Sequence, residues 1–529
     1  MTPLAHLHST LVDAAGDGPL RSQPSLERPP KAEFGDYSTN LAMLLAPLRG
    51  EKPRAVAESL EGELRARLGA SLERVEIAGP GFINLFLSDA WYADALAHVL
   101  DAGEDFGGGA VETPERINVE FVSSNPTGPV HLGHARNAAY GDSVCRLLAF
   151  HGHGVAREFY ANDAGSQVKR FAESIQARAR LEEPPEGGYV GEYIKDVAAS
   201  IAGADTMALD DLARRAIELM LHNIRASLDR FRVEPFDTWF SEATLHAGKI
   251  DLAFERLAQL GHSYESEGAL WLRTTSFGDD KDRVLRRSDG EPTYFAPDIA
   301  YFLDKLERGF DRMIIVLGAD HHGYKQRMSA AFQVFGGDPG QLELLIMQFV
   351  HLVGAGGEKL GMSKRAGEFV TLDELIDEIG ADPARWFLLA RSHDTTIDLD
   401  LDLAVKESSE NPVYYVQYGH ARIHRILEKV VSTPSATPVG PLEPQERDLV
   451  KKLLAFPGDV ADAAERRAPH RIATYALELA RTFTTFYEAR SCKVAGSEQE
   501  AFRAGLCVAT QRTLARSLDL LGVSAPESM

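Results

Sequence analysis

The 529-residue chain is predicted to be an α/β protein, in which a parallel, doubly wound sheet with a helical insertion follows a small α+β region and precedes an all-α region. Three observations predict this fold class. The length exceeds that of a single hydrophobic core, so several domains are expected. A strand, a helix and a strand succeed one another over residues 117–160, which is the βαβ unit of a parallel sheet. Near the end, apolar residues recur every three or four positions, as on one face of a helix.

The small α+β region is assigned to residues 1–108. It contains Phe34-Gly-Asp-Tyr-Ser-Thr-Asn40, which an alanine- and leucine-rich helical stretch follows. In Ile77-Ala-Gly-Pro-Gly-Phe-Ile-Asn-Leu-Phe-Leu87 a glycine turn precedes an apolar run, so a turn that enters a strand is predicted. Gly107-Gly-Gly109 and Pro114 mark the boundary with the next region.

The sheet region is assigned to residues 112–371. Its predicted elements are a strand at Ile117–Val122, a loop at Ser123–Pro129, a helix at Leu132–Phe150, and further strands at Val155–Tyr160, Met313–Leu317 and Leu344–Leu352. Between about residues 172 and 290 the pattern becomes helical and polar, with a proline- and glycine-rich linker at residues 184–188. We interpret this segment as a helical insertion into the sheet region.

The all-α region begins with a helical connector at residues 372–404, which carries the end of the sheet region, and continues as a helical domain at residues 405–529. A Pro/Ser/Thr-containing stretch from Ser432 to Pro444 is predicted to be a loop between helices. Two apolar stripes with helical spacing follow it, namely Ile472, Tyr475, Leu479, Phe483 and Phe486, and then Phe502, Leu506, Leu514, Leu518 and Leu521.

Composition excludes several classes of protein. Apolar and charged contents of 44% and 25% are ordinary for a globular chain, and no run of about 18 apolar residues predicts a membrane span. The first twenty residues lack the pattern of a secretory signal. Three scattered cysteines form neither a disulfide framework nor a CxxC metal site, so inert thiols and a cytoplasmic location are expected. The net charge of −22 argues against a nonspecific nucleic-acid binder, although a local basic face for one RNA remains compatible with it.

The strongest local signal is Asn125-Pro-Thr-Gly-Pro-Val-His-Leu-Gly-His134, between a predicted strand and a predicted helix. Backbone N–H groups and the positive end of the helix dipole attract phosphate at such a helix start. His131 and His134 can donate hydrogen bonds to a phosphorus centre that gains charge, and Gly133 lets a nucleotide approach the backbone. For an isolated HxGH the alternative is a pair of capping or core histidines. The surrounding strand, loop and helix favour the phosphate site.

A second signal, Gly361-Met-Ser-Lys-Arg365, lies in a glycine-rich stretch far downstream that also contains Lys359. Ammonium groups on a loop can close over a triphosphate and neutralise the departing pyrophosphate. Alone, this tetrapeptide is equally compatible with a solvated loop. Its position after the histidine motif favours a shared nucleotide site.

Together the two motifs resemble the HIGH and KMSKS pair of class I aminoacyl-tRNA synthetases, whereas nucleotidyltransferases share only the first. The flanking segments resemble the bacterial arginyl enzymes over nearly the whole chain. The segments that carry this resemblance are residues 34–40, 79–87, 119–137, 160–165, 318–324, 394–400, 411–423 and 521–529. The resemblance implies a Rossmann-like catalytic domain, a tRNA-contacting N-terminal domain and a C-terminal anticodon-binding domain.

The second motif departs from the family pattern, because Gly361 stands where the family has its first lysine. Our hypothesis is that Lys359 supplies the missing charge. The resemblance then implies that His131, His134, Lys364 and Lys359 are catalytic. The residues it implies for ATP are Pro129, His131, Gly133, His134, Gly318, His322, Met362, Ser363 and Lys364.

A guanidinium is planar and permanently charged, so carboxylates and a flat aromatic neighbour bind it best. Family positions place the arginine substrate at Glu120, Ser123, Ser124, Asn125, His134, Tyr294, Asp298 and His321. The alternative for Asp298 is a helix N-cap after Pro297, and for Glu120 it is a structural salt bridge. Asp320-His321-His322 also resembles the DHH motif of manganese phosphoesterases, but the further aspartate-rich motifs of that family are missing, so no metal site is expected.

The resemblance implies that ATP with Mg²⁺ activates L-arginine as the adenylate, which the 3′-terminal ribose of tRNA(Arg) then accepts, commonly with tRNA already bound for the first step. A monomer is expected. Cations and aromatic side chains suit single-stranded anticodon recognition. The residues expected to contact tRNA are Phe34, Asn40, Phe82, Asn84, Tyr415, Gln417, Tyr418, Arg422 and Tyr487. The competing hypotheses are another class I synthetase or nucleotidyltransferase, and a noncatalytic RNA-binding paralogue, which the intact His131, His134, Ser363 and Lys364 disfavour.

Overall fold

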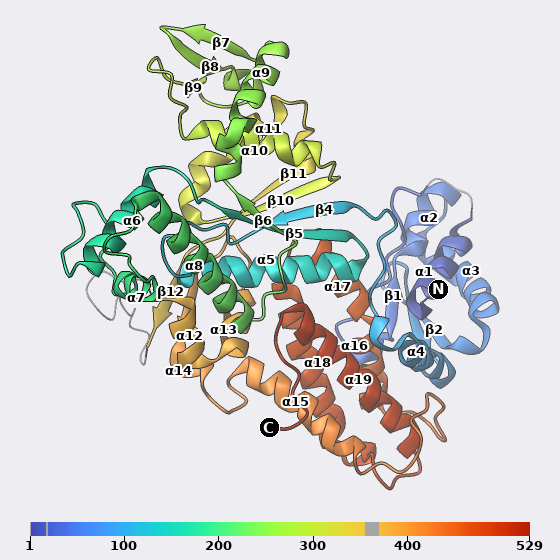
Figure 1. Ribbon diagram of the computed structural model, residues 1–529. Helices are drawn as coiled ribbons and strands as arrows, with labels where there is room; N and C mark the ends of the chain where they lie inside the picture. Colours follow the sequence, from blue (N-terminus) through green and yellow to red (C-terminus); the bar gives the residue numbers. More distant parts are fainter. Residues whose placement is uncertain (1, 17–19, 355–369) are drawn as a thin grey trace.

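The computed structural model describes residues 2–16, 20–354 and 370–529. Its centre is a five-stranded, wholly parallel sheet with the order β11-β10-β4-β5-β6 (Figure 1). The strands are β4 (Arg116–Glu120), β5 (Gly154–Ala161), β6 (Thr238–Ser241), β10 (Arg312–Leu317) and β11 (Leu342–Ile346). The predicted α/β fold class and its βαβ unit are confirmed.

Helix α5 (Leu132–His151) connects β4 to β5 and packs against the sheet. Most of its residues are buried, so it lacks the clean polar face of a surface helix. A Cβ atom on Gly141 would lie 2.3 Å from the Phe121 ring, and only glycine permits this close approach of helix and strand end. The helix ends at Gly152, which has a φ of 116°.

The segment predicted as a helical insertion is only partly helical. It contains α6 (Ser166–Ala179), α7 (Tyr193–Ser200), α8 (Leu209–Arg230) and α9 (Ile250–Gln259), but β6 completes the central sheet. An antiparallel sheet of β7 (Ser263–Ser266), β8 (Ala269–Leu272) and β9 (Arg283–Arg286) projects from the molecule beside α9 (Figure 1). These four-residue strands are too short to show a clear alternation in sequence. Helices α10 (Phe295–Glu307) and α11 (Lys325–Gln333) flank β10 in the chain.

The N-terminal region is α+β. Its antiparallel sheet has the order β1-β3-β2, and the predicted glycine turn joins β2 to β3. The elements are α1 (Pro3–Ala15), β1 (Tyr37–Thr39), α2 (Leu41–Arg49), α3 (Pro53–Leu68), β2 (Leu72–Ala78), β3 (Phe82–Leu87) and α4 (Asp89–Ala102).

The C-terminal region is helical, with one exception in the predicted connector, where β13 (Ile397–Asp400) pairs in parallel with β12 (Val350–Val353). Its helices are α12 (Leu372–Ile379), α13 (Ala381–Leu389), α14 (Leu401–Ala404), α15 (Pro412–Leu427), α16 (Pro444–Leu454), α17 (Phe456–Glu465), α18 (His470–Glu488) and α19 (Glu500–Leu520). The alternation in Thr396-Ile-Asp-Leu-Asp400 is typical of a strand, but β13 is too short for it to stand out.

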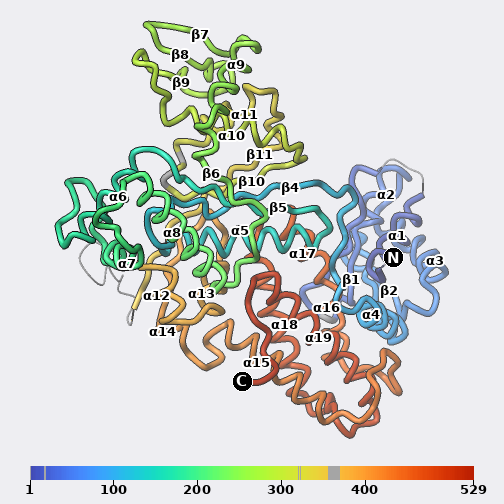
Figure 2. The backbone as a smooth tube through the Cα atoms, in the orientation of Figure 1, coloured from blue at the N-terminus to red at the C-terminus, as the bar shows by residue number. Residues whose placement is uncertain are grey.

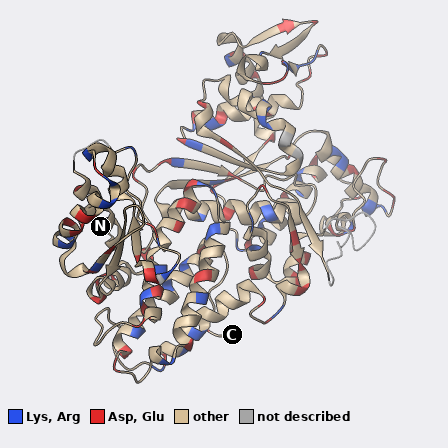
Figure 3. Ribbon diagram, turned by 180° about the vertical axis from the view of Figure 1, so that it is seen from behind, with Lys and Arg blue, Asp and Glu red and all other residues tan. Residues whose placement is uncertain are grey.

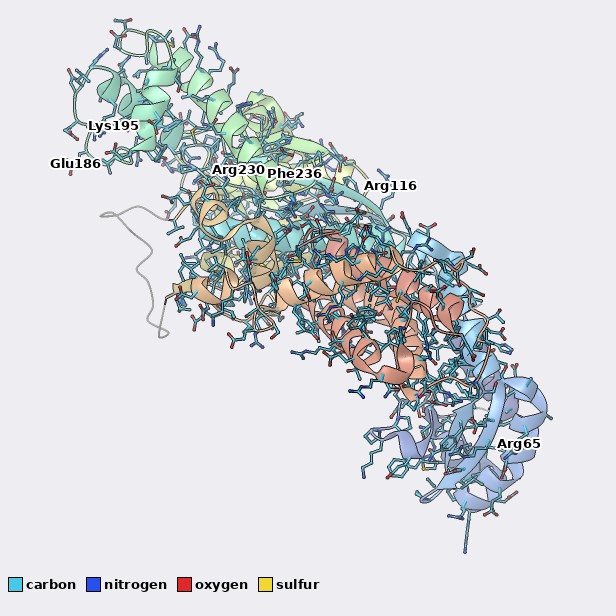
Figure 4. The ribbon with its side chains drawn as sticks, turned by 90° about the horizontal axis from the view of Figure 1, so that it is seen from below. Arg65, Arg116, Glu186, Lys195, Arg230 and Phe236 are labelled. Atoms are coloured by element: carbon cyan, nitrogen blue, oxygen red, sulfur yellow. The ribbon has the colours of Figure 1, made fainter. Side chains whose placement is uncertain are left out.

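The C-terminal helical region packs against the N-terminal region, although the two are far apart in sequence. Helices α16 and α19 pack on α4 (Figure 2), and Arg447 binds the Asp89 carboxylate at 2.7 Å. In Figure 4, Lys195 in the helical insertion and Arg65 in the N-terminal region mark opposite ends of an elongated molecule. Within the described residues, no helix is both long and apolar enough to span a bilayer.

Candidate active site

The histidine loop, residues 121–131, leaves the carboxyl end of β4 and enters α5. His131 is the N-cap of α5, and its Nδ1 accepts a hydrogen bond from the Gly133 N–H at 3.1 Å. The proton of the neutral imidazole is therefore on Nε2. The rings of His131 and His134 stack, with their centroids 3.8 Å apart. Burial and the neighbouring His131 lower the pKa of His134 to about 3, so His134 is neutral at physiological pH.

The backbone of this loop is held in a strained conformation. Val122 and Ser123 have φ angles of 67° and 39°, a region that costs β-branched residues most. Asn137 of α5 stabilises the loop, because its Oδ1 accepts from the Val122 N–H at 2.7 Å while its Nδ2 donates to the Val316 carbonyl at 3.0 Å. The side chain thus joins α5, β4 and β10 at the edge of the sheet where ligands bind in α/β folds.

The lysine motif, with Lys359, Gly361, Met362, Ser363 and Lys364, lies outside the described residues. The chain that follows it returns to the histidine loop. Leu132 donates to the Val370 carbonyl at 3.0 Å, and Leu372 donates to the Val130 carbonyl at 2.7 Å. These backbone hydrogen bonds join the chain just after the lysine motif to residues within the histidine motif.

The remaining residues predicted to bind ATP lie at the same edge of the sheet. Pro129 precedes the helix start, and Gly133 is exposed on its first turn. Gly318 follows β10, which pairs directly with β4, and begins a short 3₁₀ helix at residues 319–324. The side chains of Asp320 and His322 are not described, so the predicted ATP contact of His322 and the DHH alternative stay untested.

Among the described residues, the partly buried Asp298 of the predicted arginine pocket forms no ion pair with a lysine or arginine. It lies in the first turn of α10, whose N-cap is Tyr294, so the alternative that Asp298 caps this helix is wrong. Its Oδ2 accepts a hydrogen bond from the Tyr324 hydroxyl at 3.0 Å. Burial, with the nearby Glu242 and Glu120 carboxylates, raises the pKa of Asp298 to about 7, against the lowering effects of Tyr324 and Arg327.

Glu120, by contrast, already has a partner. Its Oε2 lies 3.0 Å from the Lys305 ammonium and 2.8 Å from the Tyr301 hydroxyl, and all three side chains are buried. Lys305 also pairs with Glu158 at 3.2 Å, and these pairings hold the pKa of Glu158 near 2 despite its burial. The alternative of a structural salt bridge for Glu120 therefore describes what the structure contains. Glu120, Glu158, Tyr301 and Lys305 thus form a buried network that joins β4, β5 and α10.

The sequence analysis did not single out Glu242, a carboxylate that lies near Asp298. It follows β6, accepts a hydrogen bond from the Tyr160 hydroxyl at 2.8 Å, and faces Asp298 closely enough to raise the pKa of that residue. The signal that identifies it is the aromatic and β-branched run Thr238-Trp-Phe-Ser241, which predicts a strand with an acid at its carboxyl end. Because this run was assigned to a helical insertion, no strand was predicted there and Glu242 was not considered as a site residue.

The other predicted arginine contacts lie on the histidine loop, at the start of α10 and after β10. Tyr294 is 71% exposed and accepts a hydrogen bond from Arg327 at 2.8 Å. Ser123 accepts from the Tyr160 N–H and donates to Glu120. Ser124 is buried, whereas Asn125 is exposed. The exposed His321 meets the Tyr324 ring edge to face at 6.2 Å.

The predicted tRNA contacts divide into surface and interior residues. Phe34 and Phe82 are exposed. Asn40 is half-buried, and its side-chain oxygen accepts from the Ser25 N–H. Asn84 is buried and accepts from Ser38, and Gln417 is buried and donates to Asp382 and Ser524. Both side chains are thus buried and hydrogen-bonded within the protein, and their predicted tRNA contacts stay untested.

On the C-terminal helices, a cation and two aromatic rings lie together. The Arg422 guanidinium lies 4.7 Å from the Tyr418 ring and 5.1 Å from the Tyr487 ring. Tyr415 instead donates to Thr484 at 2.9 Å. Figure 3 shows basic and acidic residues interspersed along the ribbon. The Tyr418–Arg422–Tyr487 cluster suits stacking with unpaired bases.

A parallel sheet with a histidine pair at its first helix start is shared by the class I aminoacyl-tRNA synthetases, and the family model of the class I (R) catalytic domain matches residues 96–183 and 195–422. The model of the arginyl tRNA synthetase N-terminal domain matches residues 4–87, and that of the DALR anticodon binding domain matches residues 416–529. The chain belongs to the arginyl-tRNA synthetase family.

Comparisons with individual proteins agree over the full length. An arginine–tRNA ligase of Bacillus licheniformis is 47% identical over 95% of this chain and 94% of its own. One of Kineococcus radiotolerans is 45% identical with complete coverage of both chains. The structure of the Thermus thermophilus arginyl-tRNA synthetase shares the fold, with a TM-score of 0.78 over both chains at 24% identity.

Proposed function

We propose that this chain is an arginine–tRNA ligase, which activates L-arginine with ATP and transfers it to the 3′-terminal ribose of tRNA(Arg). One observation carries the choice of amino acid. Asp298 and Glu242 face one another at the sheet edge next to the histidine loop, and no lysine or arginine forms an ion pair with Asp298 among the described residues. A permanently charged guanidinium is the group that balances such a pair.

In the first step, the arginine carboxylate attacks the α-phosphorus of ATP in line, and pyrophosphate leaves. No protein nucleophile is needed, so the site acts by positioning and charge stabilisation. The His131 Nε2–H and the neutral His134 donate to phosphate oxygens, and the start of α5 adds its dipole. Glu120 and Ser123 form the pocket floor near the substrate's α-amino group. The 2′-hydroxyl of the terminal ribose then attacks the acyl carbon.

Mg²⁺ belongs to the substrate in this proposal, since it enters with the triphosphate oxygens. The described residues contain no group of three or more His, Cys, Asp or Glu side chains placed to hold a metal ion. Residues 1–108 and 405–529 contact the tRNA, through Phe34, Phe82 and the Tyr418–Arg422–Tyr487 cluster. We further propose that the protein is a monomer and that it is located in the cytoplasm. Light scattering of the purified protein would test whether it is a monomer.

Aminoacylation decides the function. The purified chain, given ATP, Mg²⁺ and total tRNA, is expected to charge tRNA with labelled arginine and with no other amino acid. ATP–pyrophosphate exchange with each amino acid, with and without tRNA, separates the competing classes: another class I synthetase would respond to a different amino acid, and a noncatalytic paralogue to none. A folded protein that charges nothing contradicts the proposal.

The hypothesis about the second motif gives a separate prediction. If Lys359 replaces the lysine absent at Gly361, Lys359→Ala and Lys364→Ala should each lower the rate of adenylate formation, by roughly 10- to 100-fold, because each removes a cation from the departing pyrophosphate. Pre-steady-state measurement of arginyl-adenylate in the presence of tRNA checks this. An unaffected Lys359→Ala variant means that one lysine suffices.

The raised pKa of Asp298 predicts a pH dependence. A guanidinium binds the ionised carboxylate, so the KM for arginine should be constant above about pH 7 and should rise below it, approaching tenfold per pH unit, as arginine competes with the proton. Arginine itself stays charged throughout. KM measured between about pH 6 and 8 tests this, and Asp298→Asn should abolish the dependence. A KM that falls as the pH decreases contradicts the assignment.

A further inference from the structure

Arg327 on α11 contacts both aromatic residues beside Asp298. Its Nη1 donates to the Tyr294 hydroxyl at 2.8 Å. Its guanidinium carbon lies 4.5 Å from the centroid of the Tyr324 ring, the usual position of a cation over an aromatic face. The Tyr324 hydroxyl in turn donates to Asp298 at 3.0 Å. One side chain therefore joins the exposed rim of the pocket to its carboxylate.

Arg327 forms no direct ion pair with Asp298, and both residues belong to the described part of the chain. Its effect on the carboxylate passes through Tyr324 and through space. This arrangement leaves the Asp298 charge for another guanidinium while fixing the two rings that border it. Tyr294, the N-cap of α10, is mostly exposed, so the hydrogen bond from Arg327 restricts a side chain that the protein interior does not enclose.

We propose that Arg327 is a positioning residue of the arginine pocket, which orients Tyr294 and Tyr324 around the place where the substrate guanidinium binds and so sets the affinity for arginine. This inference rests on the proposed function and adds a residue to it. Arg327 need not touch the substrate, so its removal should act on arginine binding and leave the phosphate chemistry at the histidine loop intact.

The charge of Arg327 adds a second effect. Among the described residues, the charged and titratable groups near Asp298 include the hydroxyls of Tyr324 and Tyr160, the carboxylates of Glu242 and Glu120, and the Arg327 guanidinium. Arg327 is the cation in this set, and it lowers the pKa of Asp298 against the two carboxylates and burial. Loss of its charge should leave Asp298 protonated to a higher pH.

Two substitutions separate position from charge. Arg327→Met removes both, and should raise the KM for arginine by roughly tenfold, change kcat and the KM for ATP by less than about twofold, and move the rise of KM to higher pH. Arg327→Lys keeps the charge but loses the planar fork, so the KM should still rise while its pH dependence stays at the wild-type position. In a double-mutant cycle, Tyr294→Phe should cost much less in the Arg327→Met background than in wild type.

The exchange reaction is measured with tRNA(Arg) present, and thermal unfolding of each variant verifies that it folds. Lys325→Met is the matched control, because it removes an exposed cation from the same helix, and among the described residues no hydrogen bond or cation–π contact joins the Lys325 side chain to either tyrosine. A lower arginine KM in Arg327→Met would show that Arg327 competes with the substrate, and an unchanged KM would show that it has no part in the pocket; either result overturns the inference. If the wild-type protein charges no arginine, the proposed function fails instead.

Discussion

Replacing His134 by alanine is expected to lower kcat for arginyl-adenylate formation by about 10²- to 10³-fold, which is the usual cost of losing one preorganised donor to a developing charge. The geometry explains the size of the effect. His134 stacks on His131 at the N-terminus of α5. Burial keeps its imidazole neutral, so one ring nitrogen carries an N–H that can donate a hydrogen bond. The Nδ1 atom of His134 is buried, and it has no hydrogen-bond partner among the described residues.

The KM for ATP should change little, because the hydrogen bond strengthens mainly as charge develops on phosphorus. His134→Gln, which retains a neutral N–H donor, should recover part of the loss. His222→Ala is the control, since His222 is an exposed histidine on α8. A kcat for His134→Ala within about threefold of wild type would exclude His134 from the chemistry.

The second large effect is expected for Asp298→Asn, which keeps the shape of the side chain and removes its charge. The KM for arginine should rise by about 10²- to 10³-fold, the cost of truncating one partner of a buried charge pair. Discrimination against citrulline, whose neutral ureido group has nearly the shape of a guanidinium, should fall by a similar factor, because charge is what separates the two ligands.

Competition between labelled arginine and citrulline in the exchange reaction measures this discrimination. Glu307→Gln removes an exposed carboxylate from the last turn of the same helix and should leave both constants unchanged. If Asp298→Asn discriminates as well as the wild type, the guanidinium binds elsewhere, and Glu242 becomes the remaining carboxylate of the pocket. The accompanying Tyr324–Asp298 hydrogen bond would then be purely structural.

Local sequence patterns predicted the elements that local interactions stabilise. The helical periodicity of α18 and α19, the glycine turn between β2 and β3, and the strand, loop and helix around the histidine loop are all present. The short strands β6 and β13 were not predicted, because four residues carry little periodicity and their stability comes from pairing with β5 and β12. Missing β6 also meant missing Glu242.

The sequence alone determined the chemistry at phosphate: two histidines, a glycine and a helix start occupy ten consecutive residues, so their relative geometry follows from the local backbone. Only the tertiary structure decided which carboxylate awaits the substrate. Glu120 and Asp298 are both candidates in sequence, but Lys305 neutralises the first, while the second, among the described residues, accepts a hydrogen bond from the Tyr324 hydroxyl and has no lysine or arginine ion pair. The balance of charge in a pocket depends on side chains that folding brings together from distant segments, and that balance is not encoded in any one of them.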